Sequence, residues 1–440
     1  MQQRTSDNDQ SAIVAKRTEP SEAAGKTAEI EALADAAGYD VVETVTQTRH
    51  EDATYQFGRG KAEALGRRLA ESDIDTIVFD NPLSPQQAYS LGELLPDSVA
   101  IVDRYRLILD IFAEQAGTTE AQLQVRLAEL RYELPRVKME IRLETEAANE
   151  RRTRGGMDEK EHRRVLDLRE RIQRVEAKLD GVDTVGADRR RNHRAAGRDI
   201  VALAGYTNAG KSTLLQRLAA DLELGDNDAR HADESETAAA EDCLFKTLDT
   251  TTRRGELDGR EVLLTDTVGF VRDLPHWLVE SFESTLSVSH RADVVVLVVD
   301  ASDAPDEVDA KLDASLDTLD DADGVILPVL NKVDRLSADE LTARRRLVED
   351  RVSEVDAATD PVAVSATDAT NLDRLRSAIR RELPTECLSL VLPNTGKTQA
   401  FVSWAHDHGR VPDIDYDAES VTLTFEGRPE LVERAEARVD

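Results

Sequence analysis

The stretch GYTNAGKST at residues 205–213 decides the fold of the central part of the chain. It continues the apolar run DIVALAG and leads into LLQRLAA, which has helical spacing. Its glycines, lysine and serine give the pattern G-x-x-x-x-G-K-S, in which backbone N–H groups wrap phosphates at a helix N-terminus. We expect Lys211 to reach the β- and γ-phosphates and Ser212 to bind Mg²⁺. The predicted phosphate loop consists of Gly205, Tyr206, Thr207, Asn208, Ala209, Gly210, Lys211 and Ser212.

A second G-K-T sequence, TGKT at residues 395–398, does not fit this pattern. Val391 stands where the first glycine of a phosphate loop belongs. We therefore expect a helix start there rather than a second nucleotide site.

The base is indicated by GVILPVLNKVD, residues 324–334, an apolar strand that ends in N-K-x-D. A carboxylate at Asp334 accepts hydrogen bonds from N1–H and N2–H₂ of guanine, and adenine offers neither. The strand VAVSAT, residues 362–367, supplies a further loop that touches the base. The sequence therefore predicts GTP or GDP as the ligand, with base contacts from Asn331, Lys332, Val333, Asp334, Ser365, Ala366 and Thr367.

Two segments between these motifs have the character of switches. EVLLTDTVGF, residues 261–270, places Asp266 where it holds Mg²⁺ through water and Gly269 where its N–H meets the γ-phosphate. LFKTLDTTTR, residues 244–253, holds four threonines; we choose Thr247 as the Mg²⁺ ligand, with Thr250, Thr251 and Thr252 as alternatives. The expected metal ligands are Ser212 and Thr247, and the expected catalytic residues are Lys211, Thr247 and Gly269. Further nucleotide contacts are expected from Phe245, Lys246, Leu248, Asp249, Thr267 and Val268.

Phe270 departs from the usual GTPase pattern, in which a water-orienting glutamine follows this glycine. A phenyl ring cannot position the attacking water. We therefore expect slow intrinsic hydrolysis, with the missing catalytic element supplied by another group or a partner.

The composition indicates an intracellular protein of 440 residues and several domains. Acidic residues number 88 against 56 basic ones, which gives a net charge of −32, and arginine is far commoner than lysine. Such a chain suits a cytosol of high ionic strength, where self-repulsion is screened. Two distant cysteines form no disulfide framework, and no apolar run is long enough for a membrane span. We expect a cytoplasmic monomer that does not bind membranes.

The pattern of apolar residues divides the chain into five parts. The predicted fold is multidomain α/β: a P-loop GTPase domain with an N-terminal α/β domain, a helical hairpin and a small C-terminal α+β appendage. The acidic segment 226–242 is expected to be a loop, and Pro135 is expected to kink or end its helix. The expected boundaries are 1–10 for a tail, 11–117 for the N-terminal domain, 118–198 for the hairpin and basic linker, 199–383 for the GTP-binding domain, and 384–440 for the appendage.

Basic residues outnumber acidic ones between residues 149 and 198, against the average of the chain. DRRRNHRAAGR, residues 188–198, is the densest part. A solvated helix surface with ion pairs explains such a pattern without any ligand. The position of this basic segment beside the Gly155-Gly156 tip of the hairpin favours contact with RNA phosphates instead.

Taken together, these motifs resemble the HflX family of ribosome-associated GTPases over residues 11–383. TYQFGRGKAEAL, IVFDNPLSPQQ, GYTNAGKSTL, LFKTLDTTTR and DTVGFVRDLPH occur in that family's order. The resemblance implies binding to the large ribosomal subunit and its RNA and, in some members, splitting of stalled ribosomes. The tip TRGGMDEKEHRR departs from the longer Gly-rich tip that the family often has.

Two functional hypotheses remain open on the sequence. The first is a GTPase that binds the ribosome in its GTP state and is released by hydrolysis. The alternative is an RNA-scaffolding assembly factor in which the nucleotide is static, and equal ribosome affinity with GDP and a GTP analogue would favour it. A tRNA-modification GTPase is a third candidate, but no terminal Cys motif supports it.

Overall fold

The computed structural model describes residues 10–20, 27–150, 163–181, 198–220, 252–257, 260–267, 269–270, 276–281, 289–355 and 357–439. The chain forms two compact units. Unit 1 comprises Met1–Val182 and Leu274–Phe282, and unit 2 comprises Asp183–Asp273 and Glu283–Asp440. Within the described residues, no helix has both the length and the apolar character that a bilayer crossing requires.

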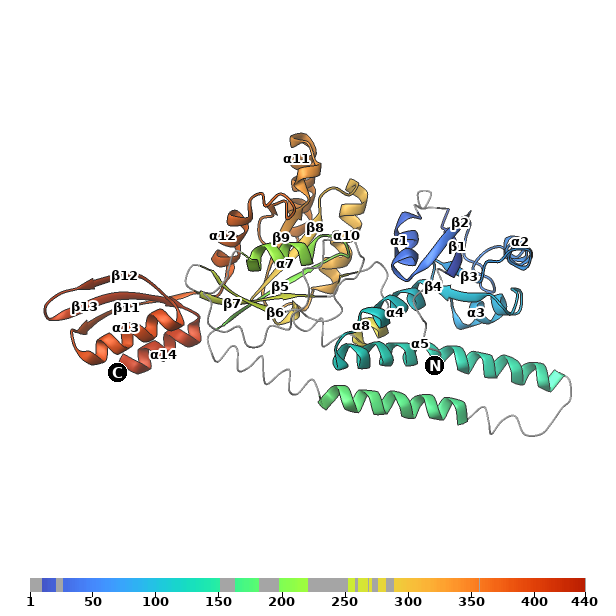
Figure 1. The fold of residues 1–440 in the computed structure, drawn as a ribbon, viewed down its shortest axis with the longest axis horizontal. Helices are drawn as coiled ribbons and strands as arrows, with labels where there is room; N and C mark the ends of the chain where they lie inside the picture. The colour runs from blue at the N-terminus through green and yellow to red at the C-terminus, as the bar shows by residue number, and fades with distance from the viewer. Residues whose placement is uncertain are drawn as a thin grey trace. The chain divides into compact units, whose positions relative to one another are not determined.

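Unit 1 contains a four-stranded sheet of order β2-β1-β3-β4 in which all neighbours are parallel (Figure 1, blue to teal). All four residues of β3 are buried, as in parallel strands covered on both faces. The sequence prediction of a parallel α/β layer is confirmed. The elements are β1 (Gln10–Thr18), α1 (Ala28–Ala36), β2 (Tyr39–Thr48), α2 (Arg59–Ala70), β3 (Thr76–Phe79), α3 (Pro85–Gly92), β4 (Ala100–Asp103) and α4 (Arg104–Gln115).

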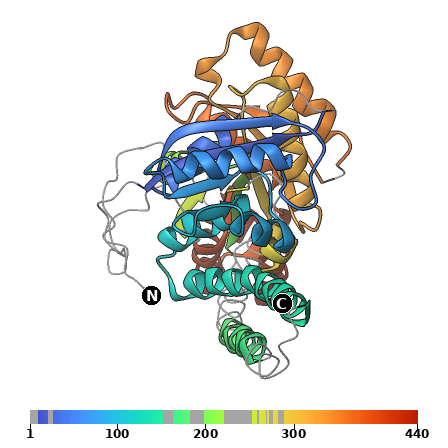
Figure 2. The ribbon, with the colours of Figure 1, turned by 90° about the vertical axis from the view of Figure 1, so that its right-hand side faces the viewer.

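The helical hairpin of unit 1 pairs α5 (Thr119–Glu150) with a second helix at residues 163–181 (Figures 1 and 2). Arg131 pairs with Glu176 at 3.0 Å and Glu140 with Arg164 at 3.1 Å, so the two helices are antiparallel. Leu130, Val137 and Leu168 are buried between them. The helix does not end at Pro135, where the sequence predicts a kink or an end.

A short helix, α8 (His276–Ser281), belongs to unit 1 although it lies between strands of unit 2 in the sequence. The Trp277 ring lies 6.2 Å from the Tyr105 ring, edge to face, and 6.4 Å from the Tyr132 ring. Arg131 Nη1 donates a hydrogen bond of 3.2 Å to Ser281 Oγ. Helix α8 thus packs on α5, the first helix of the hairpin.

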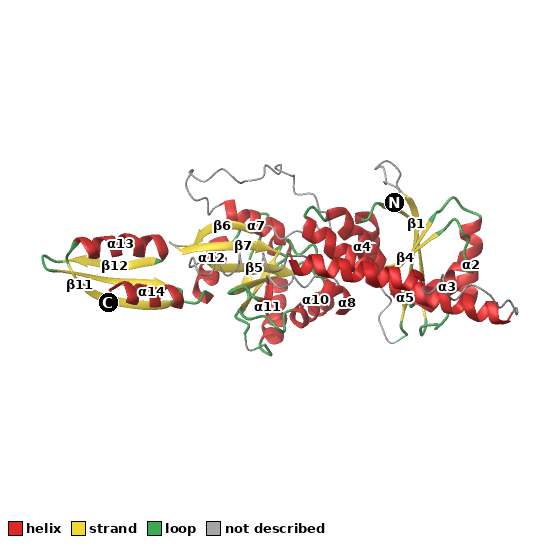
Figure 3. Cartoon of the chain, turned by 90° about the horizontal axis from the view of Figure 1, so that it is seen from below, coloured by secondary structure: helices red, strands yellow, loops and turns green. Residues whose placement is uncertain are grey.

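Unit 2 is built on a six-stranded sheet of order β10-β9-β8-β5-β7-β6, of which Figure 3 labels β5, β7 and β6. Only β6 is antiparallel to its neighbour. Strands β5 and β8 are almost wholly buried, which explains their continuous apolar runs. The elements are β5 (Asp199–Gly205), α7 (Lys211–Ala220), β6 (Thr252–Leu257), β7 (Arg260–Asp266), β8 (Val294–Asp300), α10 (Pro305–Thr318), β9 (Val325–Asn331), the 3₁₀-helix η1 (Val333–Arg335), α11 (Ala338–Val352), β10 (Val362–Ala363) and α12 (Leu372–Glu382).

The appendage is a three-stranded antiparallel sheet of order β11-β13-β12 with two helices packed on it (Figure 1, orange to red). Its elements are β11 (Glu386–Pro393), α13 (Gly396–His408), β12 (Arg410–Tyr416), β13 (Ser420–Gly427) and α14 (Pro429–Val439). The side chain of Thr395 caps α13 by accepting from Thr398 N, so TGKT is a helix start as predicted.

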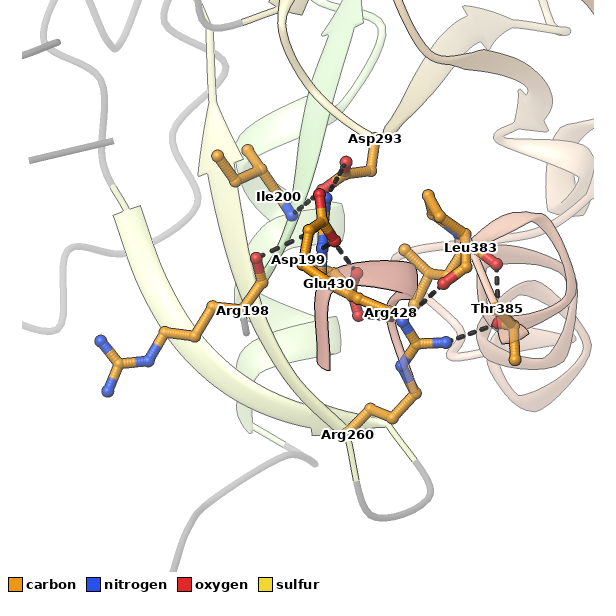
Figure 4. Close-up of polar contacts among 10 residues, drawn as sticks. Arg198, Asp199, Ile200, Arg260, Asp293, Leu383, Thr385, Arg428 and Glu430 are labelled. Carbon is orange, nitrogen blue, oxygen red and sulfur yellow. Dashed lines mark hydrogen bonds and ion pairs between the residues drawn. The ribbon is translucent and has the colours of Figure 1, made fainter. Parts of the chain in front are cut away.

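A buried arginine fixes the appendage to the sheet of unit 2. Arg428 Nη1 donates to Asp199 Oδ1 at 2.8 Å and to Asp293 Oδ2 at 2.6 Å (Figure 4). Asp199 opens β5, and Asp293 immediately precedes β8. The anchor therefore lies at the amino ends of the two central strands.

Candidate nucleotide site

The predicted phosphate loop connects the carboxyl end of β5 to the first residue of α7. Gly205 has φ +135°, and a Cβ there would lie 2.2 Å from the carbonyl oxygen of Val298. Gly210 has φ +94°, and a Cβ there would lie 2.3 Å from Asn331 Nδ2. Both positions require glycine, so the loop backbone passes against its neighbours without a side chain. Asn208 adopts φ 63°, which asparagine tolerates better than most residues.

Lys211 lies inside this loop. Its Nζ donates to the carbonyl oxygens of Gly205 at 2.9 Å and Tyr206 at 3.0 Å. Burial lowers the pKa of Lys211 to about 8, and the nearby Asp266 carboxylate opposes that shift. The ammonium is thus desolvated where the motif places phosphate oxygens.

Ser212 and Asp266 meet at the head of α7 and the end of β7. Ser212 Oγ donates to Asp266 Oδ2 at 2.6 Å, and the aspartate side chain is fully buried. A hydroxyl and a carboxylate are the oxygen ligands that suit Mg²⁺. The pair fits the predicted site, in which the serine binds the ion directly and the aspartate through water.

The segment 261–270, one of the two predicted switches, is hydrogen-bonded to the phosphate loop. Phe270 N donates to Gly205 O at 3.0 Å, and Thr207 N donates to Phe270 O at 2.9 Å. A Cβ at Gly269 would lie 2.6 Å from Thr207 Cγ2 and 3.0 Å from Lys211 Nζ. Phe270 is buried, so its ring packs inside the protein.

Asn331 joins three loops of the site. Its Nδ2 donates to Ala209 O at 2.8 Å in the phosphate loop, and its Oδ1 accepts from Ala366 N at 3.0 Å. The residue is buried. Both ends of the amide are engaged. The side chain therefore holds the phosphate loop in fixed register with the loop at residues 365–367, called the base loop below.

The remaining predicted base contacts surround Asn331. Lys332 adopts φ 63° and precedes η1, which carries the exposed Asp334. Val333 N donates to Val364 O at 3.3 Å. Ser365 is buried, and the carbonyl oxygen of Thr367 accepts from Arg217 Nη2 at 3.1 Å. The carboxylate of Asp334 is exposed to solvent in η1.

Other predicted residues have structural partners or lie outside the described part. Thr267 Oγ1 donates to Leu203 O at 2.7 Å, and the Tyr206 ring lies 5.1 Å from Lys311 Nζ. The described residues contain no group of three or more His, Cys, Asp or Glu side chains arranged around a metal. Outside the described residues lie Phe245, Lys246, Thr247, Leu248, Asp249, Val268, the segment 226–242 and most of 188–198.

Asp300 is a site residue that the sequence reasoning missed. Its Oδ2 lies 2.6 Å from Lys332 Nζ, and its Oδ1 accepts from Ser302 N at 3.0 Å. Asp300 ends β8 directly beside Asn331 in the parallel register. A carboxylate at the end of an apolar strand was the available signal. Asp300 fixes the lysine stem that is expected to cover the base.

Comparison with family models supports this architecture. Residues 25–113 match the N-terminal region of GTP-binding GTPases, and residues 115–194 match their middle region. Residues 200–332 match a model described as a 50S ribosome-binding GTPase.

Relatives named GTPase HflX match nearly the whole chain. The protein of Thermococcus kodakarensis is 36% identical over 397 residues, covering 88% of this chain and 86% of that protein. That of Methanocaldococcus jannaschii is 32% identical over 405 residues, covering 90% and 92%. A solved structure, a GTP-binding protein from Sulfolobus solfataricus in complex with GDP, aligns with a TM-score of 0.45 and 23% identity over 84% of this chain and 97% of that one.

Proposed function

Because the chain belongs to the HflX family of GTPases and therefore hydrolyses GTP, we propose that its nucleotide state controls binding to the large ribosomal subunit. The GTP form binds, hydrolysis releases the protein, and the cycle serves to separate or recycle stalled ribosomes. The family model that matches the nucleotide domain describes a 50S ribosome-binding GTPase, which supports the choice of partner. One observation supports this nucleotide-dependent control of ribosome binding. Helix α8, which follows Gly269 in the sequence, belongs to unit 1, where it packs on α5.

The nucleotide sits with its phosphates in the loop of residues 205–212 and its base against Asp334. Ser212 and, in the GTP state, Thr247 would hold Mg²⁺, which would neutralise phosphate charge. Lys211 holds a positive charge at the β- and γ-phosphates. Asn331 keeps the base loop in register with the phosphate loop through its bonds to Ala209 and Ala366.

The γ-phosphate is sensed by Gly269. Phe270 is joined to the phosphate loop by two backbone hydrogen bonds. A shift of Gly269 toward the phosphate therefore moves Phe270 and the phosphate loop together. The chain then reaches α8, where Trp277 packs between two tyrosine rings of unit 1. This covalent path transmits the nucleotide state to the hairpin, whose 163–181 helix exposes Arg163, Arg164, Arg169, Arg174 and Lys178 toward RNA.

Hydrolysis by the free protein is slow in this scheme. The buried Phe270 ring packs in the protein and offers no polar atom to orient the attacking water. The ribosome supplies the missing element or orders a residue that does. Large subunits therefore raise GTP turnover well above the free rate.

Sedimentation of large subunits with the full chain tests the proposal. The protein is mixed with subunits and either GDP or a non-hydrolysable GTP analogue, at the high salt that its acidic composition suits. We expect at least tenfold tighter binding with the analogue. Equal affinity in both states favours the scaffold alternative, because a ligand indifferent to two states shifts neither. No binding in either state removes the ribosome as partner.

A further inference from the structure

A cavity of about 300 Å³ lies in unit 2, away from the nucleotide loops. It opens where α12, the start of β7 and the appendage meet. Arg260 begins β7 and Asp266 ends it six residues on, so about 20 Å separate this cavity from the predicted Mg²⁺ site. The cavity is lined by Arg260, Ser377, Arg380, Arg381, Thr385 and Glu426.

The lining is rich in hydrogen-bond donors. Three of its six side chains are guanidinium groups and two are hydroxyls, against one carboxylate. That carboxylate, Glu426, lies 3.8 Å from Arg380 Nη2 and also accepts from Arg410 Nη1 at 3.1 Å. One acid therefore faces several guanidinium groups. In a chain of net charge −32, this concentration of arginine reverses the prevailing sign.

Arg260 is held in place before any ligand arrives. Its Nη1 donates to Thr385 Oγ1 at 2.6 Å and its Nη2 to Pro384 O at 3.0 Å (Figure 4). Its Nη2 also lies 2.7 Å from Asp199 Oδ2, and only 6% of the side chain is exposed. A planar guanidinium fixed at the back wall loses little freedom when a ligand binds in front of it.

Helix α12 presents the other donors from one face. Ser377, Arg380 and Arg381 follow the i, i+3, i+4 spacing that places side chains together on a helix. The opposite face is buried through Leu375 and Ile379. The guanidinium groups of successive positions therefore project over the same cavity.

We propose that this cavity binds a phosphate group. Arginine forks match the oxygens of phosphate in pairs, so the guanidinium groups are the donors to the ligand, because the hydroxyls of Ser377 and Thr385 already donate to Asp373 O at 2.9 Å and Leu383 O at 2.8 Å. The volume of the cavity is about ten times the ~30 Å³ share of one water in the liquid, enough for a phosphate with its ester. The phosphate belongs either to a free phosphorylated small molecule or to the backbone of an RNA, and the recognising chemistry is the same.

A purely structural explanation makes a different prediction. Arg380 and Arg381 lie in the last turn of α12, where cations complement the helix dipole, and Arg381 Nη2 lies 2.8 Å from Glu382 Oε1. If these contacts are their whole role, replacing the arginines lowers stability and changes no anion affinity.

Calorimetry on the full chain, saturated with Mg²⁺-GDP so that the phosphate loop is filled, distinguishes the two. Pyrophosphate and a short single-stranded RNA are the probes. The test variant is Arg380→Gln with Arg381→Gln, and the matched control is Arg374→Gln, an exposed arginine of the same helix outside the lining. We expect the double variant to bind the probes at least tenfold more weakly than the native protein. The control is expected to bind them with the affinity of the native protein.

The two probes separate the sources of the phosphate. Tighter binding of the RNA identifies a nucleic-acid backbone, and binding of pyrophosphate alone identifies a small phosphorylated ligand. The proposal is overturned if the native protein binds neither probe at millimolar concentration, or if the double variant binds them as the native protein does. Because the nucleotide loop stays filled throughout, either result leaves the proposed GTPase cycle untouched.

Discussion

Replacing Asn331 by aspartate tests how the base loop is coupled to the phosphate loop. The change keeps the size of the side chain and the oxygen that accepts from Ala366 N. It replaces the donor to Ala209 O, 2.8 Å away, by a second acceptor, and the residue is only 2% exposed. A buried carbonyl left without its donor costs about 1–3 kcal/mol. If the loops must be in register to bind nucleotide, GDP affinity falls by about 5- to 150-fold.

The assay is calorimetric titration of GDP into the native and variant proteins. Asn371→Asp is the matched control, because it also removes an amide donor to a backbone oxygen, Ala363 O at 2.9 Å, at an exposed position. We expect the control to bind GDP like the native protein. Affinity of the Asn331 variant within twofold of the native value would refute the coupling.

Three further predictions concern other parts of the molecule. Arg428→Met leaves two buried carboxylates, Asp199 and Asp293, without their shared cation and is expected to lower the free energy of unfolding by about 3–5 kcal/mol, measured by chemical denaturation. Burial lowers the pKa of Lys211 to about 8, and bound phosphates favour its charged form, so GDP binding near pH 8 is expected to take up a proton and to weaken as pH rises further. Calorimetry in buffers of different ionisation enthalpy measures this proton uptake, which is expected to disappear in Lys211→Arg. Trp277→Ala is expected to reduce the difference in ribosome affinity between the GTP-analogue and GDP states at least fivefold with unchanged GDP affinity, and an unchanged difference in sedimentation would exclude α8 as the link.

The sequence predicted the features that local chemistry dictates. The central strands β3, β5 and β8 follow from continuous apolar runs, because burial on both faces leaves no alternation. The spacing of Gly205 and Gly210 predicted the phosphate loop, and the backbone angles show why glycine is needed there. The missing first glycine at Val391 distinguished a helix start from a nucleotide site.

Contacts between distant residues left no local pattern to read. Arg428 meets an aspartate 229 positions earlier, and a single arginine after a strand gives no sign of its partner. Asp300 was missed because its role depends on the register of β8 and β9. The docking of α8 on α5 was missed for the same reason. At Pro135, where the sequence predicted a kink or an end, α5 does not end, and it packs against the second helix of the hairpin on both sides of the proline.

The measurement closest to the central claim compares GDP and xanthosine diphosphate binding in the native protein and in Asp334→Asn. A carboxylate that accepts from N1–H and N2–H₂ of guanine contributes about 1.5–3 kcal/mol for each charge-assisted bond. The native protein is expected to prefer GDP by about a hundredfold or more, and the amide is expected to reverse that preference. If Asp334→Asn binds GDP as tightly as the native protein, the guanine base does not bind at Asp334.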